Sequence, residues 1–155
     1  MMRELLNKFW QNRRGSAAVE LALLMPIMMF MLAGITEIGY AFYQASALER
    51  GLRAGATYAS RTELPMSADA KTVIENLVKS ASMDGALGVS ASNWEAEGAT
   101  FAITVADRDV GSVTVSVIRL EAQVPFSPLT DELWDLLSLP DQFIEVSHEQ
   151  ASLAL

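Results

Sequence analysis

An unbroken apolar block near the N-terminus dominates the pattern of hydrophobic and polar positions. Residues 21–35 carry no charge, and the longer segment 16–36 carries only Glu20. At about 1.5 Å of rise per residue, a helix over residues 16–36 would be roughly 31 Å long. The hydrocarbon core of a bilayer is roughly 30 Å thick. The pattern therefore predicts a membrane-spanning helix close to the start of the chain.

The helical pattern continues beyond the apolar block to about Ser60. Apolar residues recur there at steps of three and four, which is the spacing of one helix face. The same segment carries a strip of small residues spaced by four: Ala47, Gly51, Gly55 and Ala59. Such a strip lets another backbone approach closely. Two interpretations stay open, namely helix packing against the sheet of the same chain and contact with another subunit.

The second half of the chain alternates between apolar and polar positions, as β-strands do. The predicted elements are a helix from Ser67 or Asp69 to about Ser82, a loop over 84–98 pinned by Trp94, strands over 100–106 and 112–124 joined by a turn at 107–111, a short helix over 131–137, and a strand over 143–152. The fold class is therefore α+β: a long N-terminal membrane-spanning helix continues into a small domain with a second helix and an antiparallel sheet of about three strands. The second half of the long helix is expected to cover one face of that sheet.

Charge is distributed unevenly along the chain, whose formal net charge is −8. Residues 1–15 have four basic side chains and one acidic one, so they carry +3, whereas the remainder has seven and eighteen and carries −11. A basic segment before an apolar helix predicts a single-pass protein of the inner, cytoplasmic membrane, with its N-terminus in the cytoplasm and its C-terminal domain outside. The acidic domain argues against nucleic acid as a partner, because phosphates would be repelled.

The residues around the start of the apolar helix indicate proteolytic processing. Arg13 and Arg14 precede Gly15, and Glu20 is the fifth residue after that glycine. This is the pattern of a prepilin leader, which a prepilin peptidase would cut between Gly15 and Ser16. The new amine of Ser16 is then expected to pair with Glu20 of a neighbouring subunit, which would offset the cost of a carboxylate among apolar helices. Removal by ordinary signal peptidase fits poorly, since no small-residue cleavage site ends the apolar block.

The segment 13–26, with the sequence RRGSAAVELALLMP, resembles the start of TadE-like proteins, which are pseudopilins or minor pilins of the tight-adherence (Tad/Flp) type IV pilus system. The aromatic residues after the apolar block and the following Arg53-Ala54-Gly55-Ala56 are similar as well. The resemblance implies a pilin-like fold, cleavage by a prepilin peptidase, assembly with other pilin and pseudopilin subunits at an inner-membrane pilus assembly platform, and a role in surface attachment. Ser16 departs from the Phe that main type IV pilins and secretion pseudopilins have after the cut, and this favours the tight-adherence branch.

These observations divide the chain into a cytoplasmic prepilin leader (1–15), a transmembrane helix in the lipid bilayer (16–40), and an extracytoplasmic pilin-like domain (41–155). The expected function is that of a processed minor pilin or pseudopilin in pilus assembly, with incorporation into the surface pilus left open. The alternative is an uncleaved single-pass membrane scaffold or sensor. The segment from Gly15 to Glu20 separates the two, because only a pilin-like subunit needs it.

No residue pattern in the sequence indicates an enzyme, a cofactor or a metal site. Asp107 and Asp109 resemble the start of a calcium loop, but the twelfth position of that loop is Ile118, which cannot bind a cation. His148 is the single histidine, and the chain has no cysteine, so zinc is not expected. The acidic clusters at 95–97 and 131–135 are interpreted as solvated surface.

Overall fold

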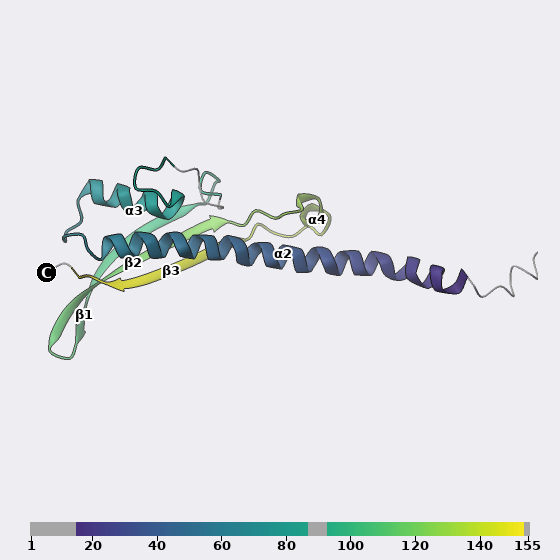
Figure 1. Cartoon of the computed structure of the whole chain (residues 1–155), viewed down its shortest axis with the longest axis horizontal. Helices are drawn as coiled ribbons and strands as arrows, with labels where there is room; N and C mark the ends of the chain where they lie inside the picture. The colour runs from purple at the N-terminus through teal and green to yellow at the C-terminus, as the bar shows by residue number, and fades with distance from the viewer. Residues whose placement is uncertain (1–14, 87–92, 154–155) are drawn as a thin grey trace, which may run out of the picture. The chain divides into compact units, whose positions relative to one another are not determined.

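The computed structural model describes residues 15–86 and 93–153 (Figure 1). The order of elements is α2 (Ser16–Ala59), α3 (Ala68–Ser80), β1 (Thr100–Val110), β2 (Val113–Pro125), α4 (Asp131–Leu136) and β3 (Phe143–Ala151). The fold is α+β, with a long apolar N-terminal helix, a second helix and a three-stranded antiparallel sheet, as the sequence predicts. The chain separates into two compact units, one ending at Ile38 and the other running from Gly39 to Leu155.

Helix α2 passes through the boundary between the two units as one element of 44 residues. Pro26 lies inside it and removes one backbone donor, so the carbonyl four residues earlier lacks its usual partner. The helix ends after Ala59, where Ser60 and Thr62 donate backbone hydrogen bonds to the carbonyls of Ala56 and Ala59. The predicted end at about Ser60 is confirmed.

Helix α3 is capped by side-chain and backbone hydrogen bonds at its two ends. The hydroxyl oxygen of Ser67 accepts a hydrogen bond of 3.2 Å from the backbone N–H of Ala70, so Ser67 is the N-cap and Asp69 lies in the first turn. At the other end Ala81 has a φ of 55°, and its N–H donates to the carbonyl of Leu77. A left-handed residue of this kind ends the helix, which is why α3 stops before the predicted Ser82.

The sheet has the order β1-β2-β3, and both pairs of strands are antiparallel. The predicted turn at 107–111 is wrong, because Val110 pairs with Val113 and the connection is only Gly111-Ser112. Gly111 has a φ of 67°, the left-handed conformation that a tight two-residue hairpin turn requires at its first position. The hydroxyls of Thr114 and Ser116 donate hydrogen bonds to the carboxylates of Asp109 and Asp107 across the two strands, and these keep the acidic residues in the ladder.

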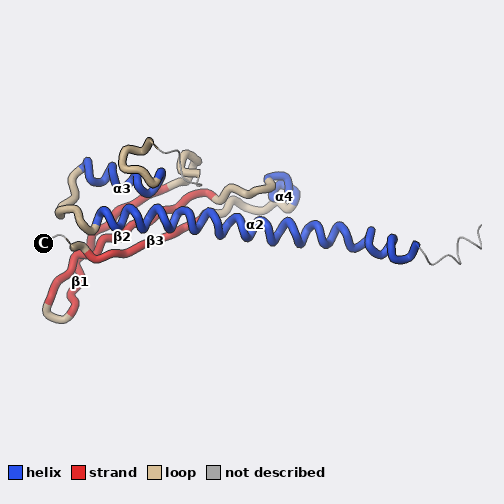
Figure 2. Tube along the Cα trace, viewed as in Figure 1, coloured by secondary structure: helices blue, strands red, loops and turns tan. Residues whose placement is uncertain are grey.

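One face of the sheet is covered by α3 and by the second half of α2, and the core lies between them (Figure 2). The buried core residues are Leu48, Leu52, Ala56 and Ala59 of α2, Ile74 and Val78 of α3, and Ile118, Leu120, Ala122 and Val124 of β2. The side chain of Trp94 packs against this core with its ring edge-to-face on Phe101 at 6.5 Å, and Lys79 lies 5.6 Å from the Trp94 ring centre. Trp94 therefore anchors the end of the predicted loop, although residues 87–92 lie outside the described part of the chain.

Candidate processing and assembly segment

Gly15 and Ser16 stand at the start of α2, where the described part of the chain begins. A Cβ atom built on Gly15 would have no neighbour within 4 Å among the described residues, and the φ of Gly15 is not in the left-handed region. Residues 15–86 and 93–153 therefore place no steric demand for glycine at position 15. Arg13 and Arg14, the other predicted processing residues, lie outside the described residues.

Ser16 and Glu20 are four residues apart, so they lie one above the other on the same side of α2. Both side chains are exposed, and Glu20 makes no ion pair with any residue in the described ranges. The structure thus leaves the Glu20 carboxylate accessible to another molecule at the start of an apolar helix.

The N-terminal unit of α2 presents apolar side chains on all sides. An 18-residue window of the helix has a mean hydropathy of 2.1, and none of that window is buried. The exposed apolar residues are Val19, Leu21, Leu23, Leu24, Met25, Ile27, Met28, Met29, Phe30, Met31, Leu32, Ile35 and Ile38. By length and composition, the helix has the properties of a membrane anchor.

Two glycines of the strip of small residues lie against α3 of the same chain. Ala47, Gly51, Gly55 and Ala59 are all buried. A Cβ atom added to Gly51 would clash with the backbone carbonyl of Val78, and one added to Gly55 would lie 2.7 Å from Cγ2 of Val78. At Gly51 and Gly55 the nearest neighbours belong to α3 of the same chain, whereas the intramolecular interpretation expected the sheet.

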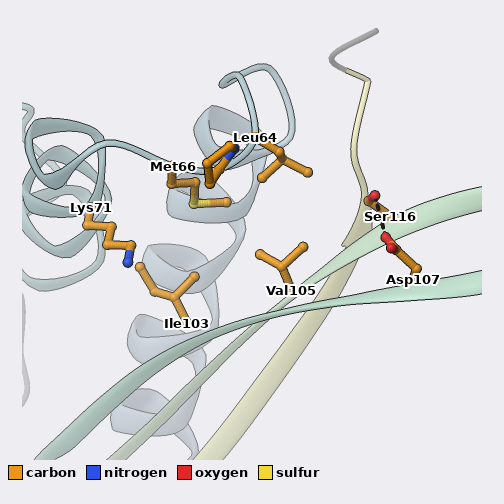
Figure 3. A pocket seen from close by; sticks show the side chains of 8 residues that line it. Leu64, Met66, Lys71, Ile103, Val105, Asp107 and Ser116 are labelled. Atoms are coloured by element: carbon orange, nitrogen blue, oxygen red, sulfur yellow. Dashed lines mark hydrogen bonds between the residues drawn. The ribbon is translucent and has the colours of Figure 1, made fainter.

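A cavity of about 560 Å³ opens between the α2–α3 connection and the β1–β2 hairpin (Figure 3). Leu64, Met66, Ile103 and Val105 form its apolar walls, while Lys71 lies at one end and the hydrogen-bonded pair Asp107 and Ser116 at the other. The lining includes no histidine or cysteine, and its one carboxylate, that of Asp107, accepts the hydrogen bond of the Ser116 hydroxyl.

The remaining residues considered for metal binding are spread over the sheet. Asp107 and Asp109 lie on strand β1, and His148 lies on β3 opposite Leu120 of β2, on the face toward the core. Within residues 15–86 and 93–153 no group of three or more His, Cys, Asp or Glu side chains could hold a metal ion.

Gln44 is a structural residue that sequence reasoning missed. Its side chain is only 2% exposed. Its Nε2 donates a 2.6 Å hydrogen bond to the carbonyl of Ser127, and its Oε1 accepts a 3.4 Å hydrogen bond from the Ser127 N–H. The available signal was spacing, since Gln44 stands four and eight residues before the buried Leu48 and Leu52 and is therefore a polar residue on the core-facing stripe.

Comparison with protein families matches residues 15–57 to the model of the TadE-like protein family. The match begins at Gly15 and ends two residues before the end of α2, so it covers the predicted cleavage site, Glu20, the apolar segment and most of the small-residue strip. No curated protein and no solved structure matches the chain. The sequence resemblance to the TadE-like family is thus confirmed over this segment.

Proposed function

We propose that this chain is a minor pilin or pseudopilin of a tight-adherence pilus, processed by a prepilin peptidase and used in pilus assembly for surface attachment. The observation that carries the proposal is the TadE-like match over residues 15–57, which starts at the residue before the proposed cut. A Tad pilus-associated role is what the matched segment indicates, and the finer assignment rests on the residues around Gly15.

The leader over residues 1–15 keeps the precursor in the inner membrane with its N-terminus in the cytoplasm. Its net charge of +3 resists translocation, and Arg13 and Arg14 hold it at the membrane surface. The peptidase then cuts after Gly15, where a side chain would obstruct a narrow cleft. Since no contact among the described residues requires glycine at this position, we assign the need for a glycine to the peptidase.

The cut removes the leader and creates a new N-terminal amine on Ser16, which is positively charged and lies at the start of α2. Glu20 of a neighbouring subunit supplies the opposite charge. A carboxylate on an apolar helix surface is unfavourable unless it is paired, so the Ser16–Glu20 pair would set the axial register between subunits. Other pilin and pseudopilin subunits and the inner-membrane assembly platform are the partners in this step.

N-terminal sequencing of the mature protein, isolated from membranes and from sheared surface fibres, tests the proposal. The expected first residue is Ser16 in both fractions. A mature protein that retains residues 1–15 would instead support the uncleaved single-pass scaffold or sensor. A mature protein that begins beyond the apolar segment would show removal by signal peptidase.

A further inference from the structure

The three-stranded sheet has two outer strands, β1 and β3, and each has an open edge (Figure 2). Within residues 15–86 and 93–153, no backbone hydrogen bond joins the outer edge of either strand to another segment. Such an edge presents unpaired N–H and C=O groups and is a template for a further strand. Strands β1 and β3 run in the same direction, because each is antiparallel to β2. A β3 strand from a second copy in the same orientation would therefore form a parallel pair with β1.

The edge of β1 lies beside the cavity of about 560 Å³ (Figure 3). Ile103, Val105 and Asp107 line it from β1, and Ser116 lines it from β2. The side chain of Val105 is 43% exposed, although its partner Ile118 in β2 is fully buried. The apolar side of the sheet thus continues beyond the part that the helices cover, and apolar side chains of an added strand would enter the cavity.

Strand β3 carries an order of side chains that matches the order in β1. On the core-facing side, each strand has two apolar residues followed by a polar one, and the next residue, on the opposite side, is charged. One parallel register brings these residues together in pairs, namely Ile103 with Ile144, Val105 with Val146, Asp107 with His148 and Arg108 with Glu149 of the next copy. Apolar pairs and pairs of opposite charge on neighbouring strands stabilise a sheet.

The polar groups in this register have capacity for a second partner. Arg108 forms an ion pair of 3.4 Å with Glu149 of its own copy, yet the two side chains are 61% and 40% exposed. A guanidinium has several N–H donors, so Arg108 can bind another carboxylate. Asp107 accepts a hydrogen bond from Ser116, and its carboxylate has further acceptor positions for a ring N–H of His148.

The side chains select this register over its neighbours. A parallel register has to keep the apolar positions on the core-facing side, so it changes in steps of two residues. A step in one direction places His148 beside Val105, and a step in the other direction places Val146 beside Asp107. Either step also separates the arginine from the glutamate.

We propose that copies of this chain associate edge to edge, with β3 of one copy adding to β1 of the next in this register. The contact is heterologous, because it uses a different edge on each of the two copies. Every added copy therefore leaves one edge free for another copy. The contact lies within residues 100–151 and does not depend on proteolytic processing.

The register also shifts each copy along the strands. Within one copy Val105 lies level with Gln150 across β2, whereas in the contact it lies level with Val146 of the next copy. This difference of four residues corresponds to a shift of roughly 13 Å. A contact with such a shift does not close into a ring, and it builds an open, stepped array.

Disulfide cross-linking of single-cysteine variants of the full chain in detergent tests the proposal, because the chain has no cysteine of its own. Ala106→Cys and Ser147→Cys change exposed residues on the side of the sheet away from the core, and the register places them side by side between copies. The two variants are mixed and oxidised, and one carries a small tag so that the mixed dimer has its own mobility in gels.

Ala102→Cys mixed with Ser147→Cys is the matched control. Ala102 is an exposed alanine on the same strand and the same side as Ala106, but it lies four residues, or roughly 13 Å, from the cross-linking position. That distance is too long for a disulfide. Labelling with a monofunctional maleimide checks that every thiol is reactive.

We expect a several-fold higher yield of mixed dimer from Ala106→Cys with Ser147→Cys than from the control mixture. Adding Arg108→Glu to the first variant should lower the yield several-fold. Adding Glu149→Arg to the second variant should then restore it, which a contact within one copy would not do.

Three results would overturn the inference. Equal yields from the two mixtures would show proximity without the proposed register. Efficient dimers of Ala106→Cys alone would show that β1 pairs with a second β1. Reactive thiols that give no dimer in any mixture would show that the sheet edges of two copies do not associate. Each of these results leaves the proposed pilus assignment unchanged, because processing and family membership do not depend on this contact.

Discussion

At the scale of single residues, Gly15 and Glu20 stand out because no contact within the described part of the chain requires them. A Cβ atom at Gly15 meets nothing, and Glu20 is exposed without an ion pair in the described part of the chain. Residues that do not stabilise the folded chain are those that can be substituted without loss of structure. Changes at these two positions therefore report on processing and assembly rather than on folding.

Substitution of Gly15 by Leu should block processing, because the side chain obstructs the cleft of the peptidase. An immunoblot of membranes should show only a full-length form that retains the leader over residues 1–15. Gly34→Leu is the matched control, since a Cβ atom there also meets nothing within 4 Å, and it should be processed normally. Normal processing of Gly15→Leu would show that the leader is assigned wrongly.

Substitution of Glu20 by Ala should leave cleavage intact and prevent incorporation into fibres. Loss of one partner of a buried ion pair costs on the order of 3–5 kcal/mol. That loss is enough to abolish a weak association between the subunit and the fibre. Immunoblots of sheared fibres and of membranes should find the processed variant in membranes only. Glu49→Ala removes a carboxylate from an exposed pair with Arg53 on the same helix, a pair of little energetic value, and should assemble. Wild-type amounts of Glu20→Ala in fibres would contradict the pairing.

At the scale of elements, α2 has different roles in its two halves. Its first half exposes apolar side chains on all sides, and its second half buries a face made of Leu48, Leu52 and small residues. Gly51 and Gly55 bring the backbone of α2 close to Val78 of α3. These two glycines of the strip therefore face a neighbour within the same chain.

The substitution Gly51→Ala should destabilise the domain even though alanine favours helices. The added methyl group would clash with the Val78 carbonyl, and such overpacking costs about 1–3 kcal/mol of stability. The gain in helix propensity from Gly to Ala is smaller, at about 1 kcal/mol or less. Gly39→Ala is the matched control, because its Cβ atom has open space and only the gain in propensity applies. Thermal unfolding in detergent should give a lower midpoint for Gly51→Ala and an unchanged or higher one for Gly39→Ala. Equal midpoints would contradict close packing of α2 on α3.

At the scale of the whole molecule, the uneven charge and the long apolar helix α2 predict an orientation in the membrane. The +3 leader should stay in the cytoplasm, and the acidic domain should lie outside. The domain has its own core between α2, α3 and the sheet.

A reporter enzyme that is active only outside the cytoplasm, fused after Leu155, should therefore be active. The same reporter fused before Met1 should be inactive, because the leader keeps that end inside. The measurement is reporter activity in whole cells at matched expression. Activity of the N-terminal fusion alone would show that the orientation is the opposite one. It would also contradict the proposal that the chain is a pilus subunit.

The sequence by itself determined the elements and their character, because hydrophobic periodicity is a local property of the chain. The block over 21–35, the helical continuation to about residue 60 and the alternating strands are all visible in it, and so are Gly15 and Glu20. Tertiary structure decided what covers each face, because that depends on residues far apart in sequence. Gln44 binds Ser127 and Gly51 lies against Val78, and neither partner is visible from local spacing. The hairpin turn lies at Gly111-Ser112 rather than at the predicted 107–111, and this too depends on contacts with another strand. Hydroxyl groups of β2 hold Asp107 and Asp109 in β1.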